Sequence, residues 1–152
     1  MKMPIIRPVP ISLKNRNFIM RIIIWFFSTR KWEMTADWRF VLHDKTEIVI
    51  PKGFIFDGAS VPKLLWAILS PVGLLFIPGL IHDYSYKYNC LIQQDDEGNK
   101  TLYQNRAGKW YWDKLFLKTA IQLNGFTFID LLAWLALTVG GWWTWLNYRK
   151  KR

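Results

Sequence analysis

The amino-acid sequence predicts a single α+β domain, in which a small N-terminal antiparallel β-sheet is followed by three or more helices, the last of them strongly apolar. At 152 residues the chain is long enough for one domain with a core and too short for two. Hydrophobic residues make up 51% of it, which is enough to build that core. Within this domain, residues 1–152, we place the core in residues 30–125 and an apolar helix, a candidate for membrane association, in residues 126–147.

Strands are predicted in the first part of the chain. The run FIMRIIIWFF (residues 18–27) is rich in β-branched residues and too short to cross a membrane, so it predicts a strand. Residues 38–43 (WRFVLH) and 47–51 (EIVIP) flank the turn DKT and predict a hairpin. Residues 53–60 (GFIFDGAS) predict a short strand that ends in a turn at Asp57.

Helices are predicted after these strands. The first covers residues 61–69 (VPKLLWAIL) and is capped by Ser60 or Asp57. The second runs from about Leu80 to Asn89, and the third covers residues 109–123 (KWYWDKLFLKTAIQL). The polar insert between these two, residues 93–109, predicts an exposed loop with a hairpin around residues 97–99.

The C-terminal run FTFIDLLAWLALTVGGWWTWL (residues 126–146) has close to the roughly 20 residues that cross a bilayer. Tryptophans and the basic tail NYRKKR follow it, as they do at membrane anchors. Asp130 and the pair Gly140-Gly141 argue against a span, because a charge is costly in lipid and glycine weakens a helix. A transmembrane helix and a buried or interfacial helix therefore remain equal alternatives.

The net charge of +10 predicts an anionic partner. Ten Trp and six Tyr residues favour a membrane surface, because these side chains combine an apolar body with a polar group. No basic stripe alternates with aromatic residues, so nucleic acid ranks below an anionic membrane, and a protein partner is the alternative. The first 18 residues contain prolines and basic residues and lack the apolar region of a cleavable signal peptide.

The stretch GLIHDYSYKYN (residues 79–89) contains the candidate site. His82 and Tyr86 are four residues apart and share a helix face, while Asp83 points about a quarter-turn away. Asp113 lies on the apolar stripe of the third helix, where a carboxylate needs a partner. A carboxylate bonded to one imidazole nitrogen leaves the other as a base, so His82, Asp113 and Tyr86 are candidate catalytic residues. Asp83 is a candidate metal ligand through its carboxylate oxygens.

Three blocks of the sequence resemble a family known mainly as a domain of unknown function in tailed phages and prophages. The blocks are IPKGFIFDGASVPKLLW, GLIHDYSY and WDKLFLKTA, and the similarity covers roughly residues 30 to 145. They match the patterns Gly-Phe-x-x-Asp-x-Ala-Ser-x-Pro, His-Asp-x-x-Tyr and Asp-x-x-Phe in this order. The resemblance implies a related fold and a phage origin, with the protein either in the virion or at a host membrane. It implies no reaction.

The His-Asp-x-x-Tyr block, with an aspartate on a later helix, also resembles the site of phospholipases of the A-two type. By this resemblance His82 would activate water, Asp83 would bind Ca²⁺, Asp113 would orient His82, and Tyr86 would support Asp113. The usual Tyr-x-Gly-x-Gly calcium loop is missing, and only Gly73 and Gly79 occur in the preceding apolar run. The single cysteine also rules out the disulfide framework of the secreted enzymes.

Four interpretations of this site stay open. One is a polar cluster that only fixes helix packing. The second is a phospholipase-like hydrolase, and the third is another metal-assisted hydrolase with Asp57 as a further ligand. The fourth is a non-catalytic phage protein that binds a membrane or a protein. A hydrolase requires His82 within hydrogen-bond reach of Asp113 and Asp83 facing an opening, whereas a binding protein can bury all three.

Overall fold

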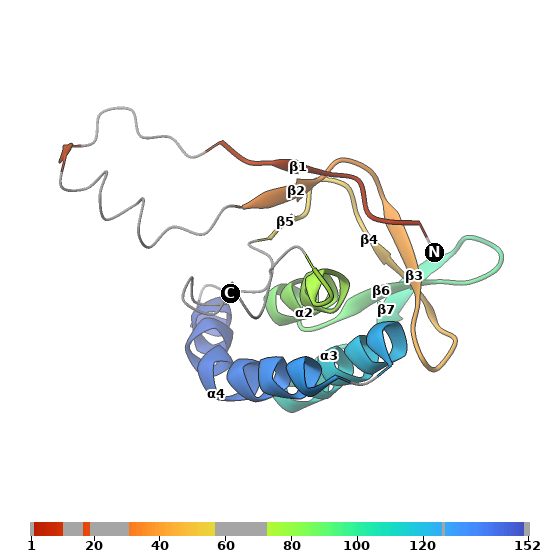
Figure 1. The fold of residues 1–152 in the computed structure, drawn as a ribbon. Helices are drawn as coiled ribbons and strands as arrows, with labels where there is room; N and C mark the ends of the chain where they lie inside the picture. The colour runs from red at the N-terminus through yellow and green to blue at the C-terminus, as the bar shows by residue number, and fades with distance from the viewer. Residues whose placement is uncertain (1, 11–16, 19–30, 57–72, 126, 151–152) are drawn as a thin grey trace.

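A computed structural model of the chain describes residues 2–10, 17–18, 31–56, 73–125 and 127–150 (Figure 1). It has the predicted α+β class: in the described residues five strands come first and three helices follow, with a two-stranded hairpin between the first and second of these helices. The turn at Asp57, the cap at Ser60 and the predicted helix over residues 61–69 lie outside the described residues. So does nearly all of the predicted strand over residues 18–27.

The described strands form two antiparallel sheets. The first sheet has the order β1-β2-β5, and the second has the order β3-β4-β6-β7. Their bounds are Ile6–Pro8 (β1), Trp32–Met34 (β2), Trp38–Val41 (β3), Glu47–Ile50 (β4), Ile55–Phe56 (β5), Leu91–Gln94 (β6) and Lys100–Tyr103 (β7).

The predicted hairpin over residues 38–51 is confirmed as the pair β3–β4, in which Trp38 lies opposite Ile50. Alternating side chains explain this strand pair, because Trp38 and Phe40 are buried while Arg39 and Val41 face solvent. The polar insert forms the hairpin β6–β7, which turns at Asp95 and Gly98. Because β6 pairs with β4, this insert extends the N-terminal sheet instead of standing apart as a loop.

The helices are α2 (Phe76–Tyr88), α3 (Lys109–Asn124) and α4 (Phe128–Lys150). Helix α2 begins earlier than the predicted start near residue 80, with Pro78 in its first turn, where proline needs no hydrogen bond from its nitrogen. It ends at Asn89, whose left-handed conformation (φ 54°) allows its N–H to cap the carbonyl of Ser85.

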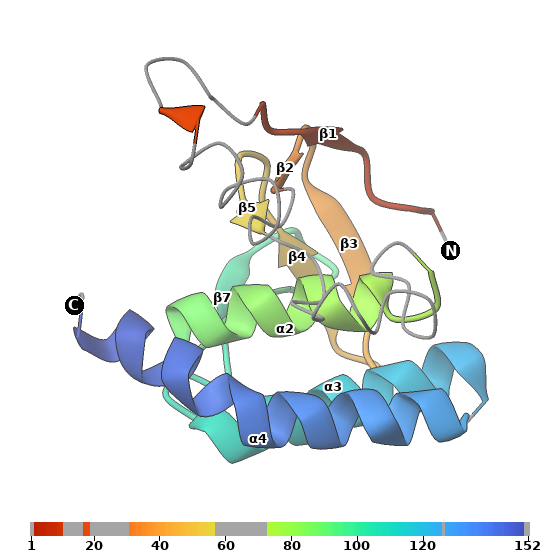
Figure 2. The same cartoon turned by 60° about the vertical axis from the view of Figure 1, so that its left-hand side comes forward.

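Helix α2 lies in the middle of the fold, with most strands on one side and α3 and α4 on the other (Figure 2). It contacts β5 and β6 as well as both of these helices. The main core therefore forms around α2, from buried side chains of the sheets and of α2 and α3, among them Phe40, Ile48, Leu80, Ile81 and Trp112.

Helix α4 is the outermost helix, packed on α3 and α2. At its start the carboxylate of Asp130 accepts hydrogen bonds from the Thr127 N–H at 2.9 Å and from the Asn124 side-chain amide at 2.8 Å. The aspartate is thus a local cap rather than a charge within an apolar span. Among the described residues α4 is the one helix long and apolar enough to cross a membrane, and only 22% of its most apolar window is buried.

Candidate functional site

Asp113 is the centre of a buried polar cluster. Its side chain is fully buried, and it contacts three side chains that can donate hydrogen bonds. The Nε2 atom of His82 lies 3.0 Å from Oδ1, the Tyr86 hydroxyl lies 2.5 Å from the same oxygen, and the Lys109 ammonium lies 2.6 Å from Oδ2. We call these four residues the Asp113 cluster.

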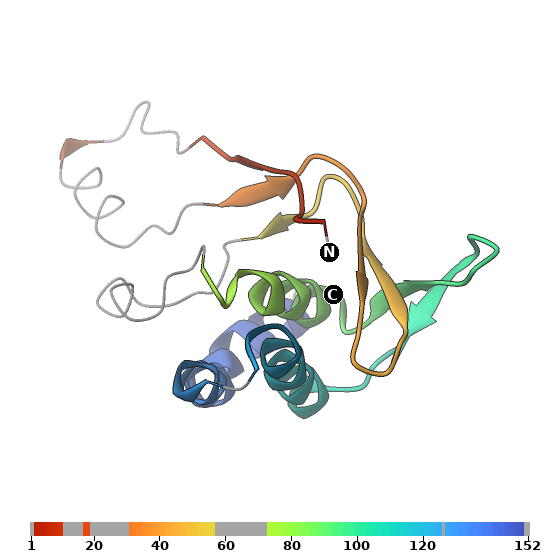
Figure 3. The ribbon, with the colours of Figure 1, turned by 45° about the vertical axis from the view of Figure 1, so that its right-hand side comes forward.

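Two helices supply all four members of the Asp113 cluster. His82 and Tyr86 are one turn apart on α2, and their rings lie 3.9 Å apart between centroids. Lys109 and Asp113 are one turn apart on α3. The two pairs face each other because α2 and α3 pack side by side (Figure 3). The predicted meeting of His82, Tyr86 and Asp113 is confirmed as geometry, while their catalytic roles stay predictions.

Lys109 is the member that the sequence interpretation missed. Its side chain is almost completely buried and donates to the carbonyl of Thr138 on α4 at 2.7 Å as well as to Asp113. The rings of Trp110 and Trp142 approach its ammonium, with centroids at 5.9 and 5.2 Å. The available signal was the spacing of four residues to Asp113, which places a cation and an anion on one helix face.

The charges of the Asp113 cluster balance. Burial alone would raise the pKa of Asp113, but the hydrogen bonds from His82, Lys109 and Tyr86 outweigh it and lower this pKa below its usual value. Burial lowers the pKa of His82, although the contact with Asp113 opposes the shift. Burial, together with the bond to Asp113, raises the pKa of Tyr86.

The lowered pKa of Asp113 favours its anionic form, while the lowered pKa of His82 and the raised pKa of Tyr86 favour their neutral forms. By its geometry Lys109 forms an ion pair with Asp113. Because an anionic carboxylate only accepts hydrogen bonds, the proton of neutral His82 sits on Nε2 and is donated to Asp113. The other ring nitrogen, Nδ1, therefore carries the lone pair that a general base needs.

Helix α4 covers this cluster. Gly141 lies against Tyr86 so closely that a Cβ atom there would meet the Tyr86 hydroxyl at 2.7 Å. The Trp145 ring packs edge-on against Tyr86, with 5.2 Å between centroids. Arg149, near the end of α4, donates to the backbone carbonyl of Tyr86. His82, whose ring lies beside that of Tyr86, is only 3% exposed.

The structure does not assemble the predicted metal site in the part it describes. Asp83 is half-buried on α2, and Asp57 lies outside the described residues. No group of three or more His, Cys, Asp or Glu side chains suited to a metal ion occurs within the described ranges. Calcium binding by Asp83 remains a prediction that rests on the resemblance to phospholipases. Asp57 remains a candidate ligand for a different metal-assisted hydrolase.

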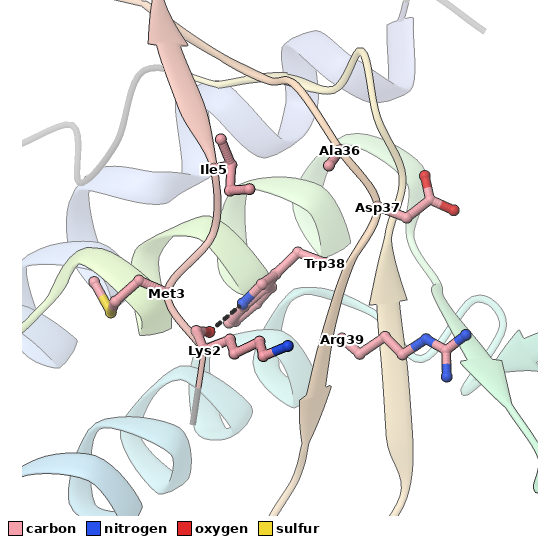
Figure 4. Close-up of a pocket in the computed structure, with 7 residues that line it drawn as sticks. All are labelled: Lys2, Met3, Ile5, Ala36, Asp37, Trp38 and Arg39. Atoms are coloured by element: carbon pink, nitrogen blue, oxygen red, sulfur yellow. Dashed lines mark hydrogen bonds between the residues drawn. The ribbon is translucent and has the colours of Figure 1, made fainter.

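A groove of about 390 Å³ lies between the N-terminal segment and β3 (Figure 4). Two of its three charged side chains have partners: Asp37 binds Lys100 at 3.1 Å, and Arg39 lies 3.7 Å from Glu47. The Trp38 indole N–H in its wall donates to the carbonyl of Lys2. Among the described residues of the groove, only the Lys2 ammonium is left to bind a ligand, whereas a specific ligand site needs several convergent polar groups.

The solvent side of α4 carries a continuous apolar row. Its members recur at intervals of three and four residues, which places them on one face of the helix. We call this row the outer stripe of α4; it consists of Phe128, Leu132, Leu135, Val139, Trp142, Trp143 and Leu146, all exposed to solvent.

Comparison with known proteins identifies one relationship. A family model described as "Protein of unknown function (DUF1353)" matches residues 32–137. This region includes both sheets except β1, the complete Asp113 cluster, and α4 up to Leu137. No curated protein and no solved structure matches the chain significantly.

Proposed function

The chain belongs to the DUF1353 family, whose description assigns no activity, and from the geometry of α4 we propose that the protein binds the surface of anionic membranes. The observation that carries this proposal is the outer stripe, a row of large apolar side chains left in solvent along one face of the outermost helix. A contiguous exposed apolar surface is typical of an interaction site.

The apolar contribution to the free energy of membrane binding comes mainly from the most exposed members of the stripe. Val139 and Trp143 are each 76% exposed, and Phe128 is 70% exposed. Moving one fully exposed side chain of this kind out of water contributes about 1.5–3 kcal/mol. Trp142 and Trp143 stand side by side on the stripe, and tryptophan favours the headgroup region of a bilayer. Transfer of the stripe into lipid is therefore favourable.

The charge on α4 favours anionic lipid over another apolar partner. Arg149 and Lys150 occupy its last turn, and its one acidic residue, Asp130, is buried at the opposite end. The chain as a whole carries a net charge of +10. Each basic residue near an anionic bilayer contributes roughly 1 kcal/mol at physiological ionic strength. Apolar and electrostatic terms thus act together at one surface, as in other interfacial helices.

Vesicle flotation tests the proposal. We expect the protein to float with vesicles of phosphatidylcholine and phosphatidylglycerol, and to bind pure phosphatidylcholine more weakly. Leu135→Glu, in the stripe, should weaken binding about tenfold or more, since a lost leucine contact and a buried carboxylate each oppose docking. Leu102→Glu is the matched control, because Leu102 on β7 is also an exposed leucine and the charge change is the same.

Two results would refute membrane binding. One is a chain that stays in solution with anionic vesicles at low salt. The other is an equal loss of binding in Leu135→Glu and Leu102→Glu, which would show that only net charge matters. In either case a protein partner becomes the better interpretation of the stripe. The phage origin implied by the sequence resemblance stays a prediction.

A second candidate function is hydrolysis at the membrane surface, with His82 as the base. The separation of 3.0 Å between His82 and Asp113, which leaves Nδ1 as the basic nitrogen, favours it. The test is fatty-acid release from anionic phospholipid vesicles, with and without Ca²⁺, by the protein and by His82→Ala. Release that the variant loses would support catalysis. Bound vesicles without release under any metal would identify the Asp113 cluster as a packing element.

A further inference from the structure

The two faces of α4 differ in what they contact. The inner face lies on the Asp113 cluster, through Thr138, Gly141 and Trp145. The outer face is the apolar stripe. We propose that α4 is a lid over His82 and Asp113, and that docking of the outer stripe to an anionic lipid surface moves the lid aside and opens the cluster to water. This inference rests on the proposed membrane function and adds regulation to it.

The Asp113 cluster does not depend on α4 for its own hydrogen bonds. All three groups bonded to the Asp113 carboxylate come from α2 or α3. Helix α4 adds two hydrogen bonds to members of the cluster, one from Lys109 to the Thr138 carbonyl and one from Arg149 to the Tyr86 backbone carbonyl. Both acceptors are backbone carbonyls in partly buried positions, and water can replace each lost partner when α4 leaves. We therefore expect the hydrogen bond between His82 and Asp113 to remain after the lid opens.

The contact of α4 with the cluster is close. At Gly141 no side chain projects from the helix, and its backbone rests on the Tyr86 hydroxyl. Near the other end, Arg149 donates to the backbone carbonyls of Tyr86 and Lys87, and the Trp145 ring enters the core around α2. Opening of the lid therefore withdraws the Trp145 indole from this core, and the headgroup region of a bilayer is an environment that tryptophan favours.

Helix α4 also keeps its own structure when it moves. Asp130 caps it through Thr127, in the turn between α3 and α4, and through Asn124, the last residue of α3. In that turn Gly125 adopts a left-handed conformation with φ of 70°, so the junction is a short turn rather than a continuous helix. A capped, largely apolar helix on a short turn can rotate toward lipid as a unit.

The chemical probe for the lid is carbethoxylation of histidine by diethyl pyrocarbonate, read by peptide mass spectrometry. The chain has two histidines: His82 is buried within the Asp113 cluster, while His43 is exposed and serves as the internal standard. We expect His43 to react at the same rate with and without vesicles. His82 should react slowly in solution and about tenfold faster or more on anionic vesicles, as expected for an opened site.

Two variants sharpen this experiment. Leu135→Glu, which should not dock, is expected to keep His82 protected when vesicles are added. Gly141→Ala forces α4 away from Tyr86, and we expect it to raise the reactivity of His82 in solution without lipid. Gly140→Ala is its matched control, because a Cβ atom at Gly140 meets nothing within 4 Å.

The possible failures are distinguishable. If the chain floats with anionic vesicles and His82 remains as protected as in solution, the lid is refuted while membrane binding stands. If the chain does not float, the proposed function itself fails. The protection of amide hydrogens in β4, a buried strand, against exchange distinguishes opening of the lid from unfolding of the domain. Loss of protection in β4 together with His82 would mean that lipid unfolds the domain, and this too would overturn the lid.

Discussion

Alanine substitutions at the two adjacent glycines of α4, Gly140 and Gly141, measure the effects of helix propensity and of packing separately. Both lie inside the helix, where replacing glycine with alanine contributes about 1 kcal/mol of stability through the backbone. Gly140 faces open space, so Gly140→Ala should show this gain in full. At Gly141 an added Cβ atom would lie 2.7 Å from the Tyr86 hydroxyl and 3.2 Å from its ring. Gly141→Ala should therefore destabilise the domain relative to Gly140→Ala.

The magnitude follows from how firmly Tyr86 is held. Its hydroxyl is 2.5 Å from Asp113, so the ring cannot swing away without losing a hydrogen bond to a charged group. Overpacking of this kind costs about 1–3 kcal/mol. Since the gain in helix propensity is the same at both positions, the free energies of unfolding of the two variants should differ by about 1–3 kcal/mol.

Urea unfolding followed by tryptophan fluorescence measures this difference. The mechanism predicts a further result in the Tyr86→Phe background, where the clash with the hydroxyl is gone. There the difference between Gly140→Ala and Gly141→Ala should shrink, which a double-mutant cycle detects as coupling. Equal stabilities of the two alanine variants would refute the packing of α4 on the Asp113 cluster. An undiminished difference without the hydroxyl would refute Tyr86 Oη as its cause.

Two further predictions concern the charges of the Asp113 cluster. Asp113→Asn should lower the free energy of unfolding, measured in urea, by about 3–5 kcal/mol, because it leaves the Lys109 ammonium buried without its anion. Adding Lys109→Met should recover most of that loss. If Asp113→Asn unfolds like the unmodified protein, the ion pair is not buried as described. The free energy of unfolding should depend on pH through His82. Folding lowers the pKa of His82 from 6.5, so the neutral side chain stabilises the fold fully above about pH 6.5. This stabilisation is lost as the pH falls from there through the pKa of the folded state. Protonation of one histidine lowers the free energy of unfolding by up to about 1.4 kcal/mol per pH unit. Urea unfolding at several pH values measures this slope, and we expect His82→Asn to flatten it.

Local spacing in the sequence was enough to predict half of the Asp113 cluster. Residues four apart on a helix share a face, so His82 and Tyr86 had to lie together. The helical period also placed Asp113 among apolar neighbours, where an anion needs a donor. The hairpin over residues 38–51 followed in the same way from alternation and a turn. All of these depend on the backbone period within a single element.

The burial of Lys109 by α4 could not be predicted from the spacing of residues within one element. Lys109 stands at the start of α3, beside the polar insert, and its burial comes from α4 folding back over it. The insert itself became β6 and β7 because β4 offered a free edge to pair with. Turn residues predicted the hairpin around residues 97–99, and spacing placed Lys109 near Asp113. The pairing of β6 with β4 and the burial of Lys109 have no local signal, because both depend on contacts between segments far apart in the chain.

The sequence by itself determined the α+β class, the helical faces of His82, Tyr86 and Asp113, and the apolar character of α4. Periodicity, charge and composition are local properties, and they are the same in any arrangement of the elements. Only the tertiary structure decided that Lys109 pairs with Asp113, that α4 covers Tyr86 and Lys109, and which face of α4 remains in solvent. A helix with apolar residues on both faces has two ways to bury them. The partner that it packs against, here α2 and α3, selects the face that is left in solvent.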